Sequence, residues 1–194
     1  MASEIQICNL ALSHLGGGRI QSINDNAKEA IECKILYPMV LESTLRSHKW
    51  AFATKRLLLG LLDEEVPGFR FVYRYPGDCL VAREIYSVNQ FDKVKFEIAL
   101  GKDNQSRVIL SDQESAVLIY TAKVENANIF DSIFIEALSW KLAGELAISL
   151  KGNTDLMQLS IQNFEHILSK AQTASANEGF IKPEDDNPYF NARL

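Results

Sequence analysis

The side chains best suited to chemistry in this sequence are three cysteines, three histidines and a few runs of carboxylates. The cysteines are odd in number, lie far apart and form no Cys-x-x-Cys pair: they are Cys8, Cys33 and Cys79. Buried thiols in a reducing compartment fit this pattern better than a disulfide framework. The histidines share no zinc-ligand spacing with one another or with a cysteine: they are His14, His48 and His166. The sequence therefore predicts no metal site.

Neighbouring carboxylates could act as acid and base on a glycan. Two runs qualify by composition, residues 63–65 (Asp-Glu-Glu) and residues 185–186 (Asp-Asp). Both stand in turn-like or tail-like sequence, where solvent makes it difficult to raise the pKa of a carboxyl for general-acid catalysis. The chain also has no Gly-x-Ser-x-Gly, no His-Glu-x-x-His, and no Gly-Lys-Ser/Thr after the glycine run 16–18. We therefore expect no catalytic residue, no cofactor and no enzymatic activity.

An aromatic and basic stretch, residues 45–56, marks a change of pattern along the chain. Before it the apolar residues recur at helical spacing, and after it they alternate as in strands. Trp50 and Phe52 are expected to fill the seam between a helical part and a sheet, because aromatic side chains dominate core energetics. A second interpretation is that this stretch binds DNA or another anionic polymer through stacking and phosphate contacts. Its cations are Arg46, Lys49, Lys55 and Arg56.

The elements that must position this stretch begin with two predicted helices. Ser3 is expected to cap the first, and Asn24 or Asp25 the second, which runs to about Ser47 with Pro38 in its interior. The inner side of the second helix is predicted to carry Ile31, Ile35, Met39 and Leu45. Helical spacing returns after residue 128. There, two further helices are expected.

The third helix should begin after a cap at Asp131 or its neighbour, and Thr154 should cap the fourth after Gly152 and Asn153 end the third. Between the helix pairs, residues 55–125 have the alternation and turn signals of antiparallel strands. In residues 69–75 this alternation places the aromatic side chains on one face. The predicted fold class is α+β: an antiparallel four-helix bundle, residues 1–54 and 126–176, with an inserted antiparallel β-sheet domain at 55–125.

The last segment, residues 177–194, is predicted to be an extended C-terminal arm. It contains two prolines, an acidic run and no periodicity, which is typical of a segment that is disordered on its own. Its apolar side chains are costly to leave in water, so we expect the arm to become ordered against another chain. An arm folded back over its own subunit is the alternative. The residues expected to bind the partner are Phe180, Ile181, Tyr189, Phe190, Arg193 and Leu194.

Charge and composition limit the partners. The 194 residues are 47% hydrophobic and 23% charged, with a formal net charge of −5. A net negative chain is a poor candidate for clamping nucleic acid by phosphate neutralisation, although a small basic patch remains compatible with it. The N-terminus lacks a basic region followed by an apolar run, and no apolar stretch reaches about 18 residues. We expect a protein that stays in the cytoplasm where it is made, or leaves it only as part of a larger assembly, with no membrane partner.

Four stretches, taken in order, carry a resemblance to a known family. They are residues 8–23, residues 30–56 with Ala-Thr-Lys-Arg at their end, residues 73–80 with Tyr-Pro-Gly-Asp, and residues 130–153. Together with the overall length, they resemble the tail tubular protein A, or head-to-tail adaptor, proteins of short-tailed bacteriophages. The aromatic and basic stretch at 45–56 is the most specific match. Residues 103–113 have no counterpart.

The resemblance implies a virion structural protein located in the tail, at the head–tail junction, and in the host cytoplasm during assembly. Similar proteins form a ring, commonly of twelve copies, under the portal protein and above the tail nozzle protein, with genomic DNA passing through the channel. Tail fibres are a further partner that this position allows. Two alternatives from other classes are a virion-associated glycan or cell-wall hydrolase, and a DNA-binding regulatory protein that uses the cations of residues 46–56.

Overall fold

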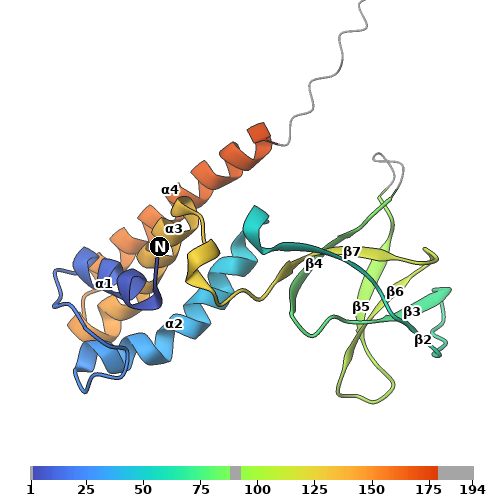
Figure 1. Ribbon diagram of the computed structural model, residues 1–194, viewed down its shortest axis with the longest axis horizontal. Coiled ribbons are helices and arrows are strands. Elements are labelled where there is room, and N and C mark those ends of the chain that lie inside the picture. The colour runs from blue at the N-terminus through green and yellow to red at the C-terminus, as the bar shows by residue number, and fades with distance from the viewer. Residues whose placement is uncertain (1, 88–92, 179–194) are drawn as a thin grey trace, which may run out of the picture.

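The structure is a computed structural model that describes residues 2–87 and 93–178, with side chains described as far as residue 175. Helices gather at one end of the elongated molecule and strands at the other (Figure 1). In the described part of the chain, all the strands lie between α2 and α3 in sequence. None of the described helices is long and apolar enough to cross a membrane.

Helix α1 (Glu4–His14) begins as predicted, whereas α2 (Lys28–Ser47) does not. The Ser3 hydroxyl accepts from the Gln6 amide and the Gln6 side chain accepts from the Ser3 amide, which makes a capping box. At α2 the position before the helix is Ala27, with no side-chain cap. The Asp25 carboxylate instead accepts from the amides of residues 21 and 22 and stabilises the preceding loop. The predicted cap at Asn24 or Asp25 was therefore wrong.

Helix α2 also buries a different face from the predicted one. Ile31, Ile35 and Met39 are exposed by 48%, 58% and 67%, whereas Leu45 is buried as expected. The buried face consists of Ala30, Cys33, Tyr37, Val40, Leu41, Thr44 and Leu45. Both sets have helical spacing, so spacing alone could not choose between them. The smaller side chains at positions 30 and 33 suit the close approach of neighbouring helices.

The predicted four-helix bundle is wrong, because one helix lies at the centre and the other three pack around it. Helix α3 (Ser132–Leu146) makes the main contacts with α1, α2 and α4 (Thr154–Glu178), while α1 and α2 touch only slightly. Its buried residues include the consecutive sets 137–139 and 142–144, which together cover more than half of the helix circumference. A helix that buries so much of its circumference lies at the centre of a core, although Glu136 and Glu145 remain exposed. The helices thus form a hub around α3 and share one hydrophobic core with it, but they do not form a four-helix bundle.

The turn from α3 to α4 is built from specific backbone chemistry. Helix α3 is capped by Asp131, as predicted, and continues into a π-helical turn at Ala147–Lys151. Gly152 then adopts the left-handed φ of +57°, which favours glycine. The Asn153 side-chain oxygen accepts from the amides of residues 155 and 156, so Asn153 caps α4 in place of the predicted Thr154. Gly144 lies against Ser160 and lets the two helices approach closely.

The predicted single β-sheet is two antiparallel sheets. One has the order β1 (Thr54–Leu58), β7 (Val117–Ala122) and β4 (Cys79–Ile85). The other has the order β2 (Leu61–Leu62), β3 (Phe71–Arg74), β6 (Arg107–Ser111) and β5 (Phe96–Leu100). Short turns are compatible with one sheet or two, and only the long-range pairings of β6 and β7 distinguish them.

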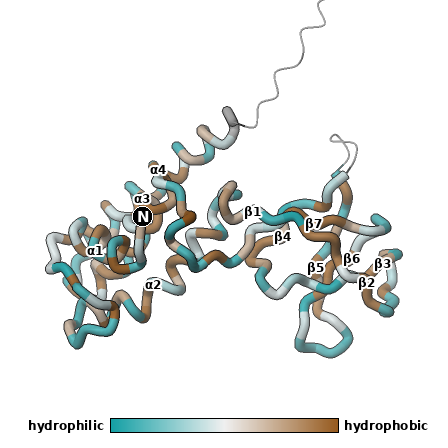
Figure 2. Tube along the Cα trace, viewed as in Figure 1, coloured by the Kyte–Doolittle hydropathy of each residue, from teal (hydrophilic) through white to brown (hydrophobic). Residues whose placement is uncertain are grey.

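The two sheets pack face to face over a shared core. That core includes Tyr73 and Ile109 from one sheet and Leu118 and Tyr120 from the other. Val72, on the opposite side of β3, packs into a separate small cluster with Val108, Leu110 and Phe69. The predicted aromatic face is thus divided, since Phe69 precedes β3 and packs with this second cluster. Figure 2 shows hydrophobic stretches along the strands and a hydrophilic loop between β5 and β6.

Candidate functional site at the helix–sheet junction

An aromatic cluster occupies the point where the chain leaves the helices and returns to them. The Phe134 ring lies 5.0 Å from the Trp50 ring, 4.9 Å from the Phe52 ring and 4.8 Å from the Phe130 ring, measured between centroids. All three pairs meet at steep angles, the favourable geometry for aromatic contacts. The exposed fraction of Trp50 is only 3%, and Phe52 is partly buried. The structure therefore brings residues 50–52 together with residues 130–134 in the helical core.

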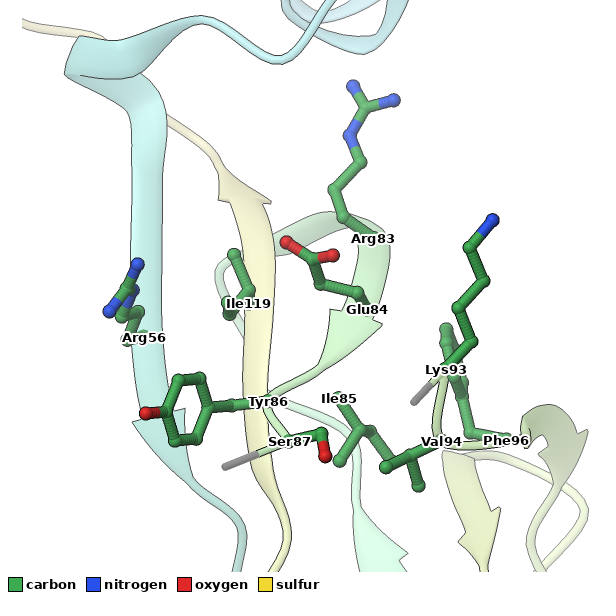
Figure 3. A pocket seen from close by; sticks show the side chains of 10 residues that line it. All are labelled: Arg56, Arg83, Glu84, Ile85, Tyr86, Ser87, Lys93, Val94, Phe96 and Ile119. Atoms are coloured by element: carbon green, nitrogen blue, oxygen red, sulfur yellow. The ribbon is translucent and has the colours of Figure 1, made fainter. Parts of the chain in front are cut away.

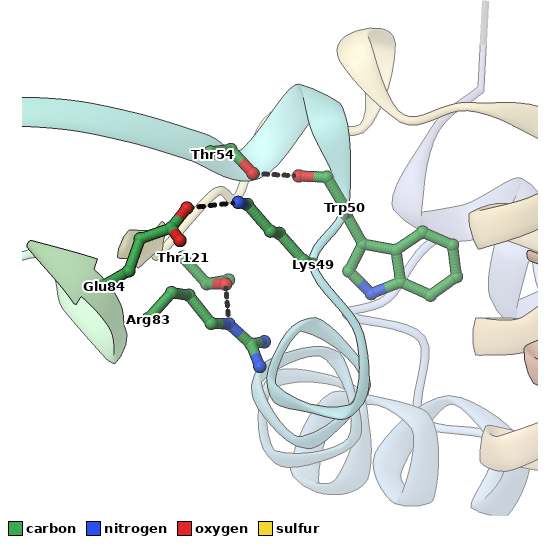
Figure 4. Close-up of polar contacts among 6 residues, drawn as sticks. All are labelled: Lys49, Trp50, Thr54, Arg83, Glu84 and Thr121. Atoms are coloured by element: carbon green, nitrogen blue, oxygen red, sulfur yellow. Dashed lines mark hydrogen bonds and ion pairs between the residues drawn. The ribbon is translucent and has the colours of Figure 1, made fainter. Parts of the chain in front are cut away.

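Trp50 makes hydrogen bonds to the residues before and after it at the connection between α2 and β1. Its indole Nε1 donates to the Thr44 carbonyl in α2 at 3.0 Å. Its carbonyl accepts from the Thr54 hydroxyl at 2.7 Å (Figure 4). The first bond satisfies the only polar group of a buried ring. The second holds the start of β1 against the turn that follows α2. The two bonds thus hold Trp50 to α2 on one side and to the start of β1 on the other.

A β-bulge in β4 supplies the link from the sheet side. Ala82 pairs with Tyr120 and Glu84 pairs with Ile119, so Arg83 is the extra residue of the bulge. The Arg83 side chain reaches the end of α2, and the Glu84 side chain reaches Lys49 just after it (Figure 4). The Arg83 guanidinium donates to the Thr121 hydroxyl at 3.0 Å, and to the carbonyls of Arg46 at 3.1 Å and His48 at 2.9 Å. A cation at this position also complements the negative end of the helix dipole.

Three of the four cations in the predicted basic patch pair with carboxylates. The distances are 3.1 Å for Arg46 to Glu42, 2.8 Å for Lys49 to Glu84 and 2.6 Å for Lys55 to Asp78. The fourth, Arg56, lies 5.9 Å from the centroid of the Tyr86 ring. Two of these carboxylates are distant in sequence: Glu84 lies in β4, and Asp78 lies in the turn before it. The cations therefore form separate ion pairs along the junction, and such exposed pairs add little stability.

The Asp78 carboxylate also links β1 to β7. One carboxylate oxygen accepts from Lys55, and the other accepts from the Tyr120 hydroxyl at 2.9 Å. The Lys55 bond, with help from Tyr120, holds the pKa of Asp78 below its usual value. Burial, followed by the Asp78 carboxylate, raises the pKa of Tyr120. Asp78 stays ionised and Tyr120 stays protonated, so the pair suits a structural link rather than proton transfer.

A hollow of about 480 Å³ lies beside the bulge, between β1, β4 and the start of β5 (Figure 3). Its charged lining is three cations and one carboxylate: Arg56, Arg83, Lys93 and Glu84. Arg83 is occupied by the three bonds described above, and Glu84 by Lys49. What remains is a weakly basic groove with Tyr86 and Phe96 in its wall. Sequence reasoning missed Arg83 because only tertiary contacts distinguish it from an ordinary strand arginine.

The other residues that the sequence analysis singled out do not come together in one site. Cys8, Cys33 and Cys79 are free, buried thiols. Within residues 2–87 and 93–178, no three His, Cys, Asp or Glu side chains are grouped to hold a metal ion. The predicted arm residues lie outside the described residues, as does the Asp-Asp run at 185–186: the arm set is Phe180, Ile181, Tyr189, Phe190, Arg193 and Leu194. Comparison of the sequence with protein-family models and with curated proteins gives no match.

Proposed function

We propose that this chain is a virion structural subunit, a head-to-tail adaptor that assembles into a ring between the portal protein and the tail nozzle protein. The ring has about twelve copies by analogy with similar proteins, and genomic DNA passes through its channel. On this proposal the protein works by contact and not by catalysis. It is located at the head–tail junction of the virion, and in the host cytoplasm before assembly.

The observation that carries the proposal is a pair of exposed apolar surfaces on different parts of the molecule. The α2 face consists of Ile31, Ile35 and Met39, exposed by 48%, 58% and 67%. The β1–β2 surface consists of Leu58 and Leu61, exposed by 61% and 63%, whereas Leu57 lies on the opposite face of β1. Clustered exposed apolar side chains typically mark protein–protein contacts. One surface belongs to the helices and the other to the strands, so they are chemically and geometrically different.

Two different surfaces on one subunit are what a closed ring requires. In a ring each subunit uses one surface toward the preceding neighbour and another toward the following one. The junction supports this use, because Arg83, Lys49 and Trp50 hold the strands to the end of α2 and so set the angle between the two surfaces. The net charge of −5, repeated around a ring, also suits a channel through which DNA slides without being held.

Complementary variants test the ring directly. Met39→Glu places a charge on the α2 face, and Leu58→Glu places one on the β1–β2 surface. Mass photometry and negative-stain microscopy of the full chain, with and without portal rings, should show a ring for the wild type and monomers for each variant. An equimolar mixture of the two variants should give heterodimers and no ring, because one intact interface remains between them.

The matched control is Leu159→Glu, which changes an exposed leucine of α4 outside both surfaces. It should assemble like the wild type. Rings formed by Met39→Glu or Leu58→Glu would contradict the proposed surfaces. A wild-type chain that neither self-associates nor binds portal rings would contradict the adaptor role itself.

A further inference from the structure

Strand β5 forms one edge of its sheet, because β6 is its only partner among the described strands. Its five residues pair with β6 in one continuous antiparallel register, from Phe96 opposite Ser111 to Leu100 opposite Arg107. On its other side, no strand lies beside the backbone N–H and C=O groups of β5 in the described part of the chain. Such an edge is a template for pairing with a further strand.

The other three edges of the two described sheets are protected in ways that β5 is not. Strand β2 has only two residues. Strand β4 has register shifts and the charged bulge residues Arg83 and Glu84, and β1 has the neighbouring cations Lys55 and Arg56. Short length, bulges and charges are the usual protection of edge strands. Strand β5 has no proline, no register shift and a single charged residue, Glu97.

The backbone groups that face the open edge of β5 belong to Phe96, Ile98 and Leu100. Just after the strand, the Gly101 amide donates to the Ser106 carbonyl at 2.8 Å, so these two residues form a hydrogen-bonded pair. In an antiparallel ladder such pairs alternate with pairs that exchange no hydrogen bond. The pairs that Phe96, Ile98 and Leu100 make with β6 are of the second kind. Their amides and carbonyls therefore point away from β6.

Two apolar side chains are uncovered at this edge. Ile98 is opposite Ile109, which is fully buried between the sheets, so both side chains project from the same face. Ile98 is nevertheless 47% exposed, and Leu100, two residues further along that face, is 59% exposed. The sheet of β1, β7 and β4 thus covers β6 but not the end of β5. An added strand would bond to the free backbone groups and place alternate side chains beside Ile98 and Leu100.

Cations lie at both ends of the open edge. Lys93 precedes β5 and Lys102 follows it, and Arg107, opposite Leu100, lies 4.1 Å from the centroid of the Tyr75 ring. None of the three cations has an ion pair within the described residues. A second copy of β5, paired antiparallel, would bring the Lys102 end of one copy to the Lys93 end of the other, and like charges so placed are destabilising. A strand with carboxylates at its ends complements the edge better.

We propose that β5 binds an extended segment of a partner protein, which adds to the sheet as an antiparallel strand with alternate apolar side chains and carboxylates at its ends. The apolar side chains lie beside Ile98 and Leu100, and the carboxylates face Lys93 and Lys102. The site is at the opposite edge of the sheet from β2, so it is separate from the α2 face and from the β1–β2 surface. The assignment does not rest on the head-to-tail role, because it concerns the single chain.

The probe is the peptide Asp-Val-Thr-Val-Thr-Val-Glu-amide, labelled at its N-terminus and titrated with the full chain by fluorescence anisotropy. It should bind saturably, and its analogue with lysine at both ends should bind about tenfold more weakly, since the charges then oppose those of the edge. In hydrogen exchange, the bound peptide should protect about three more amides in residues 94–101, because every second amide of β5 faces the edge. Equal binding of the two peptides, or no added protection, would overturn the site.

N-methylated peptides distinguish strand addition from general apolar contact. When the middle valine of the peptide lies opposite Ile98, its N–H points to β5, and the N–H of the threonine that follows it points away. N-methylation of this valine should weaken binding by at least about tenfold, and N-methylation of the threonine by less than about threefold. Equal effects of the two methyl groups would show that the peptide does not add as a strand.

One variant and a matched control locate the peptide on the chain. Ile98→Ser should weaken binding by about fivefold through lost apolar contact, with an unchanged circular dichroism spectrum and unchanged ring assembly. Ile161→Ser is the control, since Ile161, on α4, is also an exposed isoleucine, at 44%. Its affinity should equal that of the wild type. Equal effects of the two variants, or wild-type dimers in mass photometry that Ile98→Ser abolishes, would overturn a partner strand at this edge.

Discussion

The Arg83 guanidinium donates to the carbonyl oxygen of His48 at 2.9 Å and so joins the bulge of β4 to the end of α2. The two residues are 35 positions apart in sequence. The contact exists because the bulge inserts one residue into β4 where the strand passes the last turn of the helix. It makes the junction between helices and sheets a bonded structure and not a simple linker.

Arg83→Ala is expected to destabilise the fold by about 2–3 kcal/mol, because hydrogen bonds to a charged group contribute more than neutral ones and three are lost together. Urea denaturation measures this change. Arg19→Ala, at an exposed loop position, is the control and should change the free energy of unfolding by less than about 0.5 kcal/mol. An equal effect of the two variants would mean that the bulge contributes nothing to the junction.

Trp50→Ala is expected to cost about 3–5 kcal/mol, since it opens a cavity beside Phe134 in a core where Trp50 is 3% exposed. Trp50→Phe keeps an aromatic ring but loses the bond to Thr44, and should cost less. Chemical denaturation followed by circular dichroism compares the two. A loss below about 1 kcal/mol for Trp50→Ala would show that the ring is not part of the core.

The stability of the protein is expected to fall as the pH is lowered from about 8 to about 5.5, in part through His14. Burial lowers the pKa of His14, and nearby Glu136 opposes this only partly. The unfolded chain therefore binds a proton near the ordinary pKa of about 6.5 while the folded chain does not, and stability is lost over the interval down to the folded pKa.

His14 stacks on Trp140 with ring centroids 3.6 Å apart, and its Nε2 lies 3.1 Å from the Ser139 hydroxyl oxygen. That hydroxyl donates to the Glu136 carbonyl, so it accepts from His14 Nε2–H, a bond that the neutral and the charged ring can both make. His14→Phe keeps a ring on Trp140 and should flatten the pH dependence of unfolding between pH 8 and pH 5.5, to about the extent of one titrating group. If the free energy of unfolding of His14→Phe changed with pH as steeply as that of the wild type, His14 would not be a cause of the pH dependence.

Asn153→Ala is expected to cost about 1 kcal/mol, because it removes the acceptor for two amides at the start of α4. Thermal denaturation is a suitable measurement. Asn163→Ala is the control from the same helix: its exposed side chain donates to the Leu159 carbonyl and caps nothing. If Thr154→Ala were more costly than Asn153→Ala, the capping assignment would be reversed.

Local chemistry was readable from the sequence wherever neighbours in the chain decide the outcome. Ser3 with Gln6, Asp131 with Phe134 and the Gly152 turn each act within three or four residues. The change from helical to strand periodicity near Trp50 was readable for the same reason. The α+β class with antiparallel strands followed from these signals.

Tertiary structure alone decided which of two apolar stripes α2 buries, because Ile31, Ile35 and Met39 have the same spacing as the buried set. It also decided that α3 is a hub and that the strands form two sheets, since both depend on contacts between distant segments. The sequence could not predict the partners of Lys49, Lys55 and Arg83 for the same reason. A charge in sequence shows what it can bind, but only the fold brings the opposite charge within reach.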